Sequence, residues 1–161
     1  MSPRLSVKAV IVQGGRLLVT RNVDREGVFY LLPGGGQEQG ESLPEALRRE
    51  CREEIGVLVE VGDLLFVRDY IGRNHEFAEV DADFHQVELM FACTLPNGHL
   101  PRTGAQPDAR QAQVWRQTGV EWLEVARLGE YRLYPRVLVD ALRSLLQSPS
   151  KRHPVYLGDV N

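Results

Sequence analysis

The sequence predicts an α/β fold, and two kinds of pattern support this prediction. Several short apolar runs, bounded by glycine, proline or polar turn residues, are typical of β-strands. Two longer segments, 42–55 and 135–146, repeat apolar residues at helical spacing and predict amphipathic helices. Because an amphipathic helix has to bury its apolar stripe, we expect the helices to cover the sheet that the strands form.

The first part of the chain is expected to be a β-hairpin followed by a third strand. Residues 5–12 are rich in β-branched side chains, two adjacent glycines predict a turn, and residues 17–20 return as the second strand. Residues 22–27 are polar and predict a loop. Residues 29–32 predict a short apolar strand that leads into a run of three glycines.

The middle of the chain predicts three more strands. Residues 57–61 and 64–70 are expected to be two strands around a Gly-Asp turn. Residues 85–95 predict the clearest long strand, whose alternation places Val87 and Leu89 on one face and Glu88 on the other. We interpret Glu88 as a solvent-facing strand residue, and an extra carboxylate near a metal is the alternative.

Residues 71–84 form a polar stretch that predicts a solvated loop. His75, Glu76 and Asp81 leave a second metal cluster as an alternative, although their spacing matches no standard metal motif. A substrate lid or a contact with a partner chain is a further alternative, because long loops often carry function.

The last part of the chain predicts a loop at 96–112, a strand at 120–125 and a helical turn at 126–131. The second amphipathic helix then begins at Pro135. No repeat or linker divides the chain, so we expect a single domain at 1–147 followed by a C-terminal tail at 148–161.

Composition indicates a soluble cytoplasmic protein. The chain has 161 residues, 43% hydrophobic and 25% charged, and a net charge of −3, which does not favour a nucleic-acid-binding surface. Its two cysteines lie in apolar segments and indicate no disulfide framework. The N-terminal residues lack the apolar run of a signal peptide, and no segment has the roughly 18 apolar residues of a membrane span.

The segment 42–55 has the strongest local signals. Ser42 and Glu45 form a capping box at its start, and Gly56 is placed to end the helix. The three carboxylates of the helix that lie beside its apolar stripe, at i, i+3 and i+4 spacing, are those of Glu50, Glu53 and Glu54. Their mutual repulsion would be relieved by a divalent cation, and oxygen ligands suit Mg²⁺ or Mn²⁺. A solvated surface helix with ion pairs to Arg49 is the alternative.

The glycine run and this helix together resemble the Nudix box, the motif of Nudix hydrolases. From Gly35 onward the pattern is G-x5-E-x7-R-E-x-x-E-E-x-G, followed by Val57. Cys51 stands where the family has an aliphatic residue and is a mild departure. The resemblance covers most of the chain and implies an α/β/α sandwich around a mixed β-sheet.

The resemblance also implies roles for the box residues. Glu50, Glu53 and Glu54 would hold Mg²⁺ or Mn²⁺ and, with Arg49, carry out catalysis, Glu50 being the candidate general base. The backbone carbonyl of Gly34 or Gly35 would be a further metal ligand. Gly34 and Gly36 are expected to bind the substrate by letting the backbone pass close to a bound pyrophosphate. Glu41 is expected to support the site by tying the loop to the helix.

Nudix enzymes typically hydrolyse a nucleoside diphosphate linked to another group, and we expect this reaction here. ADP-ribose or a related nucleoside diphosphate sugar is the first expectation; a (d)NTP pyrophosphohydrolase and a non-catalytic nucleotide sensor are the alternatives. Arg21 and Tyr30 are candidates for contacting the substrate. A homodimer is compatible with the sequence.

Many family members have an additional glutamate in a loop before the closing strand, and this chain departs from that pattern. The candidates for its place are Asp108, Gln111, Gln113 and Gln117, with Glu121 as the first glutamate that follows. The fourth carboxylate therefore stays unassigned.

Overall fold

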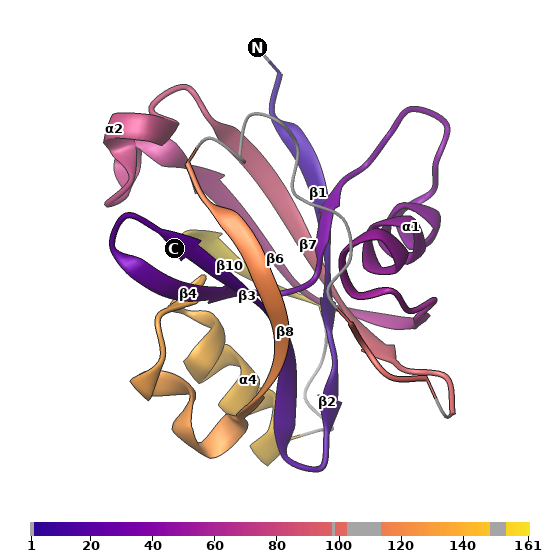
Figure 1. The fold of residues 1–161 in the computed structure, drawn as a ribbon. Coiled ribbons are helices and arrows are strands. Elements are labelled where there is room, and N and C mark those ends of the chain that lie inside the picture. Colours follow the sequence, from indigo (N-terminus) through magenta and orange to yellow (C-terminus); the bar gives the residue numbers. More distant parts are fainter. Residues whose placement is uncertain (1, 98, 103–113, 149–153) are drawn as a thin grey trace.

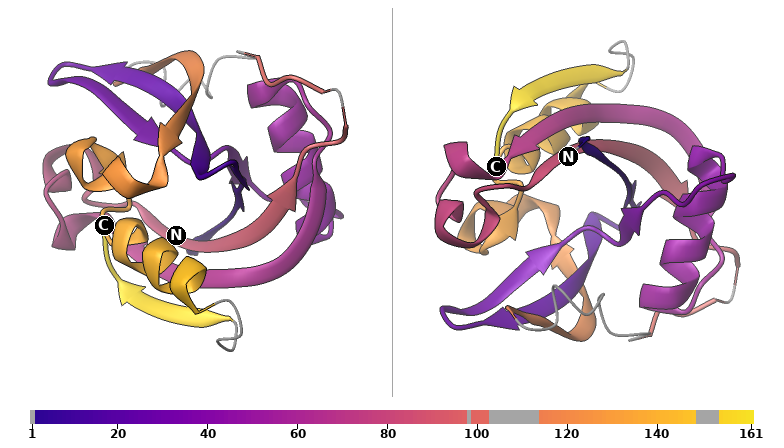
Figure 2. Two further views of the ribbon diagram at one scale, coloured as in Figure 1. Left: turned by 90° about the horizontal axis from the view of Figure 1, so that it is seen from below. Right: turned by 90° about the horizontal axis from the view of Figure 1, so that it is seen from above.

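A computed structural model describes residues 2–97, 99–102, 114–148 and 154–161. In these residues the strands form two sheets, and α1 and α4 lie on opposite sides of the molecule (Figure 1). Figure 2 shows the two sheets diverging from the region of β1 toward α2. The predicted α/β class with mixed pairing of strands is confirmed, although the strands are divided between two sheets.

The first sheet has the strand order β10-β6-β7-β1-β5. These strands are β10 (Val155–Asp159), β6 (Glu60–Ile71), β7 (His85–Thr94), β1 (Arg4–Val10) and β5 (Gly34–Gly36). The pairs β1–β7 and β10–β6 are parallel, whereas β6–β7 and β1–β5 are antiparallel. Strand β5 therefore places the glycine run directly against β1.

The second sheet has the order β2-β3-β4-β9, with β8 paired to the other side of β3. Its strands are β2 (Val12–Gln13), β3 (Arg16–Asp24), β4 (Gly27–Leu31), β9 (Leu133–Tyr134) and β8 (Arg116–Glu124). The predicted loop at 22–27 is wrong, because β3 and β4 continue as a hairpin whose last register pair is Asp24 with Gly27.

The helical segments are α1 (Leu43–Ile55), η1 (Gly72–Asn74), α2 (Ala78–Asp81), η2 (Val125–Glu130) and α4 (Leu138–Gln147). The apolar stripe of α1 packs in a core cluster with β1 and β7, and α4 packs in a second cluster with residues of β3, β6 and β8. Strand β7 contributes Met90 to one cluster and Phe91 to the other, as expected for neighbours on opposite faces of a strand.

The predicted motif helix is confirmed together with its caps. The Ser42 side chain accepts from the Glu45 amide and the Glu45 carboxylate accepts from the Ser42 amide, so both halves of the capping box are present. Gly56 ends the helix at φ +70°, and its amide donates to the carbonyl of Arg52. These local interactions fix where the helix begins and ends, and thereby where its catalytic candidates lie.

Three other predictions are corrected. Strand β6 is one strand instead of two, because its pairing with β7 resumes after an irregularity between Val61 and Leu64. The predicted loop at 71–84 contains η1 and α2, and the second amphipathic helix begins at Leu138 instead of Pro135. The predicted loop at 96–112 lies largely outside the described residues.

The C-terminal segment is not simply a tail. Residues 155–159 pair in parallel with β6, starting with Val155 opposite Phe66. Asp159 fastens this strand by accepting from the Ile71 amide at 3.0 Å, from His75 at 2.7 Å and from Asn74 at 2.7 Å. Although partial burial opposes ionisation, these hydrogen bonds lower the pKa of Asp159 to about 2.

None of the helices in the described part of the chain is long and apolar enough to cross a membrane.

Candidate active site

A cavity of about 630 Å³ lies between the two sheets. One wall comes from the first sheet, through Ser6, Lys8 and the three glycines of β5. The opposite wall comes from the second sheet, through Thr20, Phe29 and Leu31. Helix α1 contributes Arg49, Glu50, Glu53 and Glu54 at the end where the glycines lie. The motif residues therefore face a space large enough for a small-molecule ligand.

The glycine run lies so close to its neighbours that side chains are excluded. A Cβ on Gly34 would lie 2.0 Å from the carbonyl oxygen of Val7, and Gly34 has φ +140°. A Cβ on Gly35 would lie 2.5 Å from the carboxylate of Glu50. The Gly35 carbonyl accepts from Ser6 Oγ at 3.1 Å. Glycine is thus required for the backbone to pass directly beside the carboxylates of α1.

Glu54 is joined to this backbone, because its Oε2 accepts from the Gly34 amide at 3.0 Å. Burial raises the pKa of Glu54 to about 7, and the neighbouring carboxylates of Glu50 and Glu53 contribute to this rise. Lys8 and the Gly34 amide oppose it, because they favour the charged form. The ammonium of Lys8 is held at this place by the carbonyl oxygens of Gly34 at 3.2 Å and Leu32 at 3.4 Å. The positive charge near Glu54 is therefore too small to offset the effect of burial on its carboxylate.

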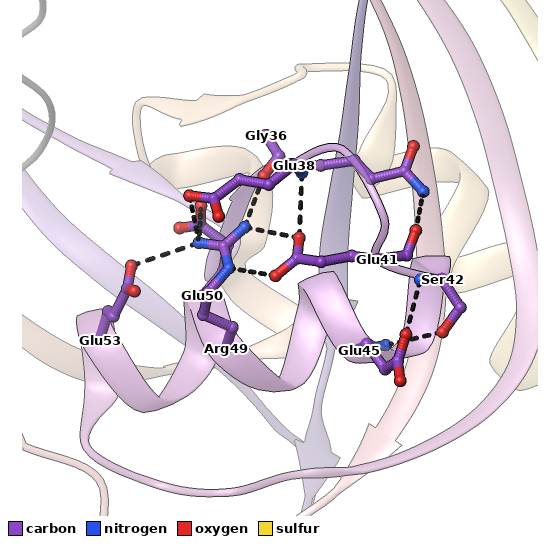
Figure 3. Close-up of polar contacts among 9 residues, drawn as sticks. Gly36, Glu38, Glu41, Ser42, Glu45, Arg49, Glu50 and Glu53 are labelled. Atoms are coloured by element: carbon purple, nitrogen blue, oxygen red, sulfur yellow. Dashed lines mark hydrogen bonds and ion pairs between the residues drawn. The ribbon is translucent and has the colours of Figure 1, made fainter.

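Arg49 links the helix to the glycine loop (Figure 3). Its guanidinium donates to both oxygens of Glu41, at 2.5 and 3.0 Å, and to the carbonyl of Gly36 at 2.9 Å. It also lies 3.0 Å from an oxygen of Glu50 and 3.5 Å from one of Glu53. The hydrogen bond from Arg49 is the main reason that the pKa of Glu41 is lowered to about 2. One cation therefore orients three carboxylates and the loop.

The predicted metal ligands lie close together but are not arranged as a coordination shell. Within the described ranges, no three His, Cys, Asp or Glu side chains are grouped so that they could hold a metal ion. The contacts of Glu50 and Glu53 with Arg49 account for this, because both carboxylates are turned toward the guanidinium. The raised pKa of Glu54 and the hard oxygen donors nevertheless fit a divalent cation in chemical terms.

Arg21 and Tyr30 do not line the cavity. They alternate along β3 and β4 with Thr20, Phe29 and Leu31, which do, and therefore project from the other face of the sheet. On that face the Tyr30 hydroxyl contacts Glu121 at 3.3 Å, and Arg21 lies 3.4 Å from Glu121. We therefore remove both residues from the candidate site.

The interpretation of Glu88 as a solvent-facing residue is wrong. Its side chain is buried and forms an ion pair with Arg68 at 2.9 Å. Although burial opposes its ionisation, Arg68 and Lys8 lower the pKa of Glu88 below its usual value. Alternation showed that Glu88 lies opposite the apolar face of β7, but the second sheet also encloses the face on which it lies, because Met90 on that face packs with residues of β3 and β8.

The remaining candidates for extra carboxylates are only partly described. Asp108, Gln111 and Gln113 lie outside the described residues, whereas Gln117 is buried and donates to the backbone carbonyl of Glu54 at 2.9 Å. Glu121 lies on the outer face of its sheet.

The alternative of a second metal cluster at 71–84 is not supported by the described side chains. His75 contacts Asp159 at 2.7 Å, Asp81 accepts from the Tyr70 hydroxyl at 2.9 Å, and Glu76 lies 3.6 Å from Arg136. His75, Glu76 and Asp81 thus each contact a different residue and do not form a common group.

Three further residues line the cavity and were not predicted from the sequence, namely Lys8, Arg68 and Trp115. A detectable signal existed for two of them, because Lys8 and Arg68 are charged residues that directly follow a valine in β1 and β6. Trp115 precedes β8, and its ring contacts Phe29 edge-on at 5.6 Å. Its place in the cavity depends on a contact between segments far apart in the sequence.

Comparisons with known proteins agree with this geometry. The model of the NUDIX domain matches residues 2–140. The nucleoside triphosphatase NudI of Escherichia coli O139:H28 (strain E24377A / ETEC) is 34% identical over 103 residues, which are 60% of this chain and 72% of that protein.

Two solved structures illustrate the likeness in fold. A MutT NUDIX hydrolase from Burkholderia pseudomallei superposes with a TM-score of 0.67 at 25% identity, over 88% of this chain and 99% of that chain. A UDP-X diphosphatase superposes with a TM-score of 0.68 at 20% identity, over 97% of this chain and 68% of that chain. The motif, its geometry and the matched family model lead to one conclusion: the chain belongs to the Nudix family of pyrophosphohydrolases.

Proposed function

We propose that this protein hydrolyses the diphosphate linkage of a nucleoside triphosphate, or of a nucleoside diphosphate joined to another group, in a reaction that depends on Mg²⁺ or Mn²⁺. The observation that carries the proposal is the contact between Glu54 and the Gly34 amide at 3.0 Å, which joins the carboxylates of α1 to the glycine loop at one end of the cavity. A diphosphate bound there would lie against backbone groups, Lys8 and the box carboxylates.

The protein residues have separate tasks in this proposal. Glu54, Glu50 and Glu53, with a backbone carbonyl at Gly35, would hold the cation, and Glu50 would accept the proton of the attacking water. Arg49 positions the carboxylates through charge-assisted hydrogen bonds. Gly34 and Gly36 keep the loop close to the phosphates, and Glu41 fixes Arg49.

The cation fits the donor set for a reason of charge. Burial and two neighbouring carboxylates raise the pKa of Glu54, so a divalent ion at this position would favour the ionised form. When bound, such an ion neutralises phosphate charge and lowers the pKa of a water molecule. Glu50 contacts Arg49 through one oxygen only, at 3.0 Å, so its other oxygen would be available to the cation. Glu53 would have to turn away from Arg49, and that contact is long, at 3.5 Å.

The substrate class has two candidates. The family resemblance favoured ADP-ribose or another nucleoside diphosphate sugar, whereas the 34% identical relative is a nucleoside triphosphatase. We place nucleoside triphosphates first, because that relative shares much more sequence than the compared diphosphatase at 20% identity. The cytoplasmic location, consistent with two free and buried cysteines, and the homodimer are retained as predictions.

The test is product release from a panel of nucleotides with and without millimolar Mg²⁺. The panel holds the four common (d)NTPs, ADP-ribose, UDP-glucose and a dinucleoside polyphosphate. Mg²⁺-dependent cleavage of the triphosphates supports the first candidate, and preferential cleavage of the sugar nucleotides would replace it with the second. Binding of these nucleotides without cleavage of any would refute the enzymatic proposal and favour a nucleotide sensor.

A further inference from the structure

A row of residues on adjacent strands runs across the cavity wall, away from the glycine loop. In register, Gly36 on β5 pairs with Ser6 on β1, Ser6 with Glu88 on β7, and Glu88 with Arg68 on β6. Residues paired in this way share one face of a sheet. Since neighbouring strands are about 4.8 Å apart, Arg68 lies roughly 14 Å from the glycine loop along this row. The cavity thus has one end at the glycine loop, where the proposed function places the phosphates, and a second end at Arg68.

The second end is formed by a buried polar group. Arg68 is 6% exposed and Glu88 is 2% exposed, and their side chains are 2.9 Å apart. Gln86 also donates to Glu88, at 3.0 Å. Arg68 additionally donates to the carbonyl of Val160 at 2.7 Å and to Oδ1 of Asn161 at 3.3 Å. Removing such a pair from water is costly, so a purely structural role would be served better by apolar residues.

Two nitrogen donors at this end have no hydrogen-bond partner among the residues that the structure describes. Among the described residues, the buried side-chain atoms without a hydrogen bond are Arg68 Nε, Asn161 Nδ2 and Asn22 Oδ1. Arg68 and Asn161 line the cavity, whereas Asn22 does not. Because an unsatisfied buried donor is unfavourable, a ligand that brings an acceptor to this place would be favoured.

Four aromatic side chains also line the cavity. Phe29 contacts Trp115 edge-on at 5.6 Å and Tyr134 at 6.1 Å, and Phe77 contacts Tyr134 at 5.2 Å. All four rings line the cavity. Aromatic walls of this kind bind planar rings, and any of the nucleobases can stack on such side chains. The walls therefore fit a base but do not select one.

We propose that Arg68, Glu88 and Asn161 read the edge of the nucleobase and select a base that carries a carbonyl oxygen next to a ring N–H, as hypoxanthine, guanine, uracil and thymine do, over adenine. This inference rests on the proposed function for the presence of a nucleotide. A carbonyl oxygen has two lone pairs and can accept from both unpartnered donors, whereas a ring nitrogen has one. The adjacent N–H donates to the Glu88 carboxylate.

In this proposal Asn161 has to move when the base binds. It lies beyond the last paired residue of β10, Asp159, and both unpartnered nitrogens are enclosed in the free protein. A small movement of Asn161 would admit the base edge, while the three hydrogen bonds to Asp159 hold the strand itself in place.

The sharpest test compares inosine and adenosine nucleotides, because these differ only in the group at C6 and the proton at N1. Binding is measured without metal by quenching of tryptophan fluorescence, since Trp115 lines the cavity. Hydrolysis of ITP and ATP is measured separately with Mg²⁺. We expect ITP to bind at least tenfold more tightly and to give at least tenfold higher kcat/KM. Equal or tighter binding of ATP would overturn the proposal.

Two variants connect the preference to these residues. Asn161→Asp has nearly the same shape but replaces a donor by an acceptor, and we expect it to reduce the ITP preference at least fivefold. Asn97→Asp, at an exposed position, is the matched control and should leave the preference unchanged. Glu88→Gln, if its circular dichroism is native, should reduce the preference likewise. An unchanged preference in Asn161→Asp would refute the assignment even if Glu88→Gln fails to fold.

The two proposals fail in different ways. Hydrolysis of ITP and ATP at equal rates would refute base selection and leave the enzymatic proposal standing. Metal-free binding that prefers ITP, with no Mg²⁺-dependent hydrolysis of any nucleotide, would refute the enzymatic proposal and support base selection.

Discussion

Gly35→Ala should separate the position of Glu50 from the stability of the fold. The new Cβ would lie 2.5 Å from Cδ and Oε2 of Glu50, whereas ordinary contact begins at 3.4 Å, so the carboxylate has to move by nearly one ångström. The group that yields is the end of a flexible side chain, and Gly35 does not have the positive φ of Gly34. The cost in stability should therefore be about 0.5–1.5 kcal/mol, as for an unfavourable rotamer.

The effect on catalysis should be much larger than the effect on stability. A displacement of about 1 Å in a catalytic group typically costs about 100-fold in rate. We therefore expect kcat to fall about 100-fold, with KM changed by no more than about threefold, because the loop still binds the phosphates. Thermal unfolding and steady-state kinetics measure both quantities.

Gly129→Ala is the matched control for this experiment. Its Cβ would meet no atom of the described residues within 4 Å, and Gly129 has no positive φ. It should have wild-type kinetics. If Gly35→Ala kept near-wild-type kcat with a native melting temperature, the reasoning that the carboxylate of Glu50 must lie beside the loop would be refuted.

Arg49, Asp159 and the two buried cysteines each allow one further prediction. Arg49→Lys keeps the charge but loses the paired hydrogen bonds to Glu41, so kcat should fall about 10- to 100-fold and binding of the product nucleotide much less; a loss confined to binding would contradict a positioning role. Despite partial burial, the hydrogen bonds that Asp159 accepts lower its pKa to about 2, so its contribution to stability is present above pH 3.8 and lost as the pH falls toward 2. Urea unfolding at pH 5 and pH 3 should show a smaller loss in Asp159→Asn than in the wild type, and an equal loss would contradict this. Burial raises the pKa of Cys93 to about 12 and that of Cys51 well above its usual value, so a thiol reagent at pH 8 should label neither in the folded protein and both in denaturant.

Much of the active-site helix could be predicted because its signals are local. The capping box of Ser42 and Glu45, the terminal Gly56 and the spacing of the carboxylates all lie within fifteen residues. Periodicity alone places Glu50, Glu53 and Glu54 beside one another. The family resemblance then supplied the expectation that these groups hold a metal.

The other end of the cavity could not be predicted because it depends on register between distant strands. Alternation showed that Glu88 lies on the face of β7 away from Val87 and Leu89, but not that β6 would place Arg68 opposite it. The docking of β10 against β6 joins residues about ninety positions apart, as in the hydrogen bond from Arg68 to Val160. No local pattern contains that information.

Which face of the β3–β4 hairpin lines the cavity could not be predicted from the sequence either. Tyr30 and Phe29 are adjacent aromatic residues, and either could line a cavity when only the sequence is considered. The pairing of β3 with β8 places Glu121 near Tyr30, and the contact of Phe29 with Trp115 turns the other ring inward. The choice between the two faces was therefore made by tertiary contacts and not by residue type.

The central claim is that the carboxylates of α1 form a metal-dependent hydrolytic site, and Glu54→Gln tests it most directly. Hydrolysis of the best nucleotide of the panel is measured at saturating Mg²⁺ in the wild type, in Glu54→Gln and in Glu124→Gln, whose position on β8 is exposed. The account predicts a loss of at least about 1,000-fold in kcat for Glu54→Gln, as for removal of a central electrostatic group, with native circular dichroism and an unaffected control. A folded Glu54→Gln enzyme with near-wild-type Mg²⁺-dependent turnover would contradict it.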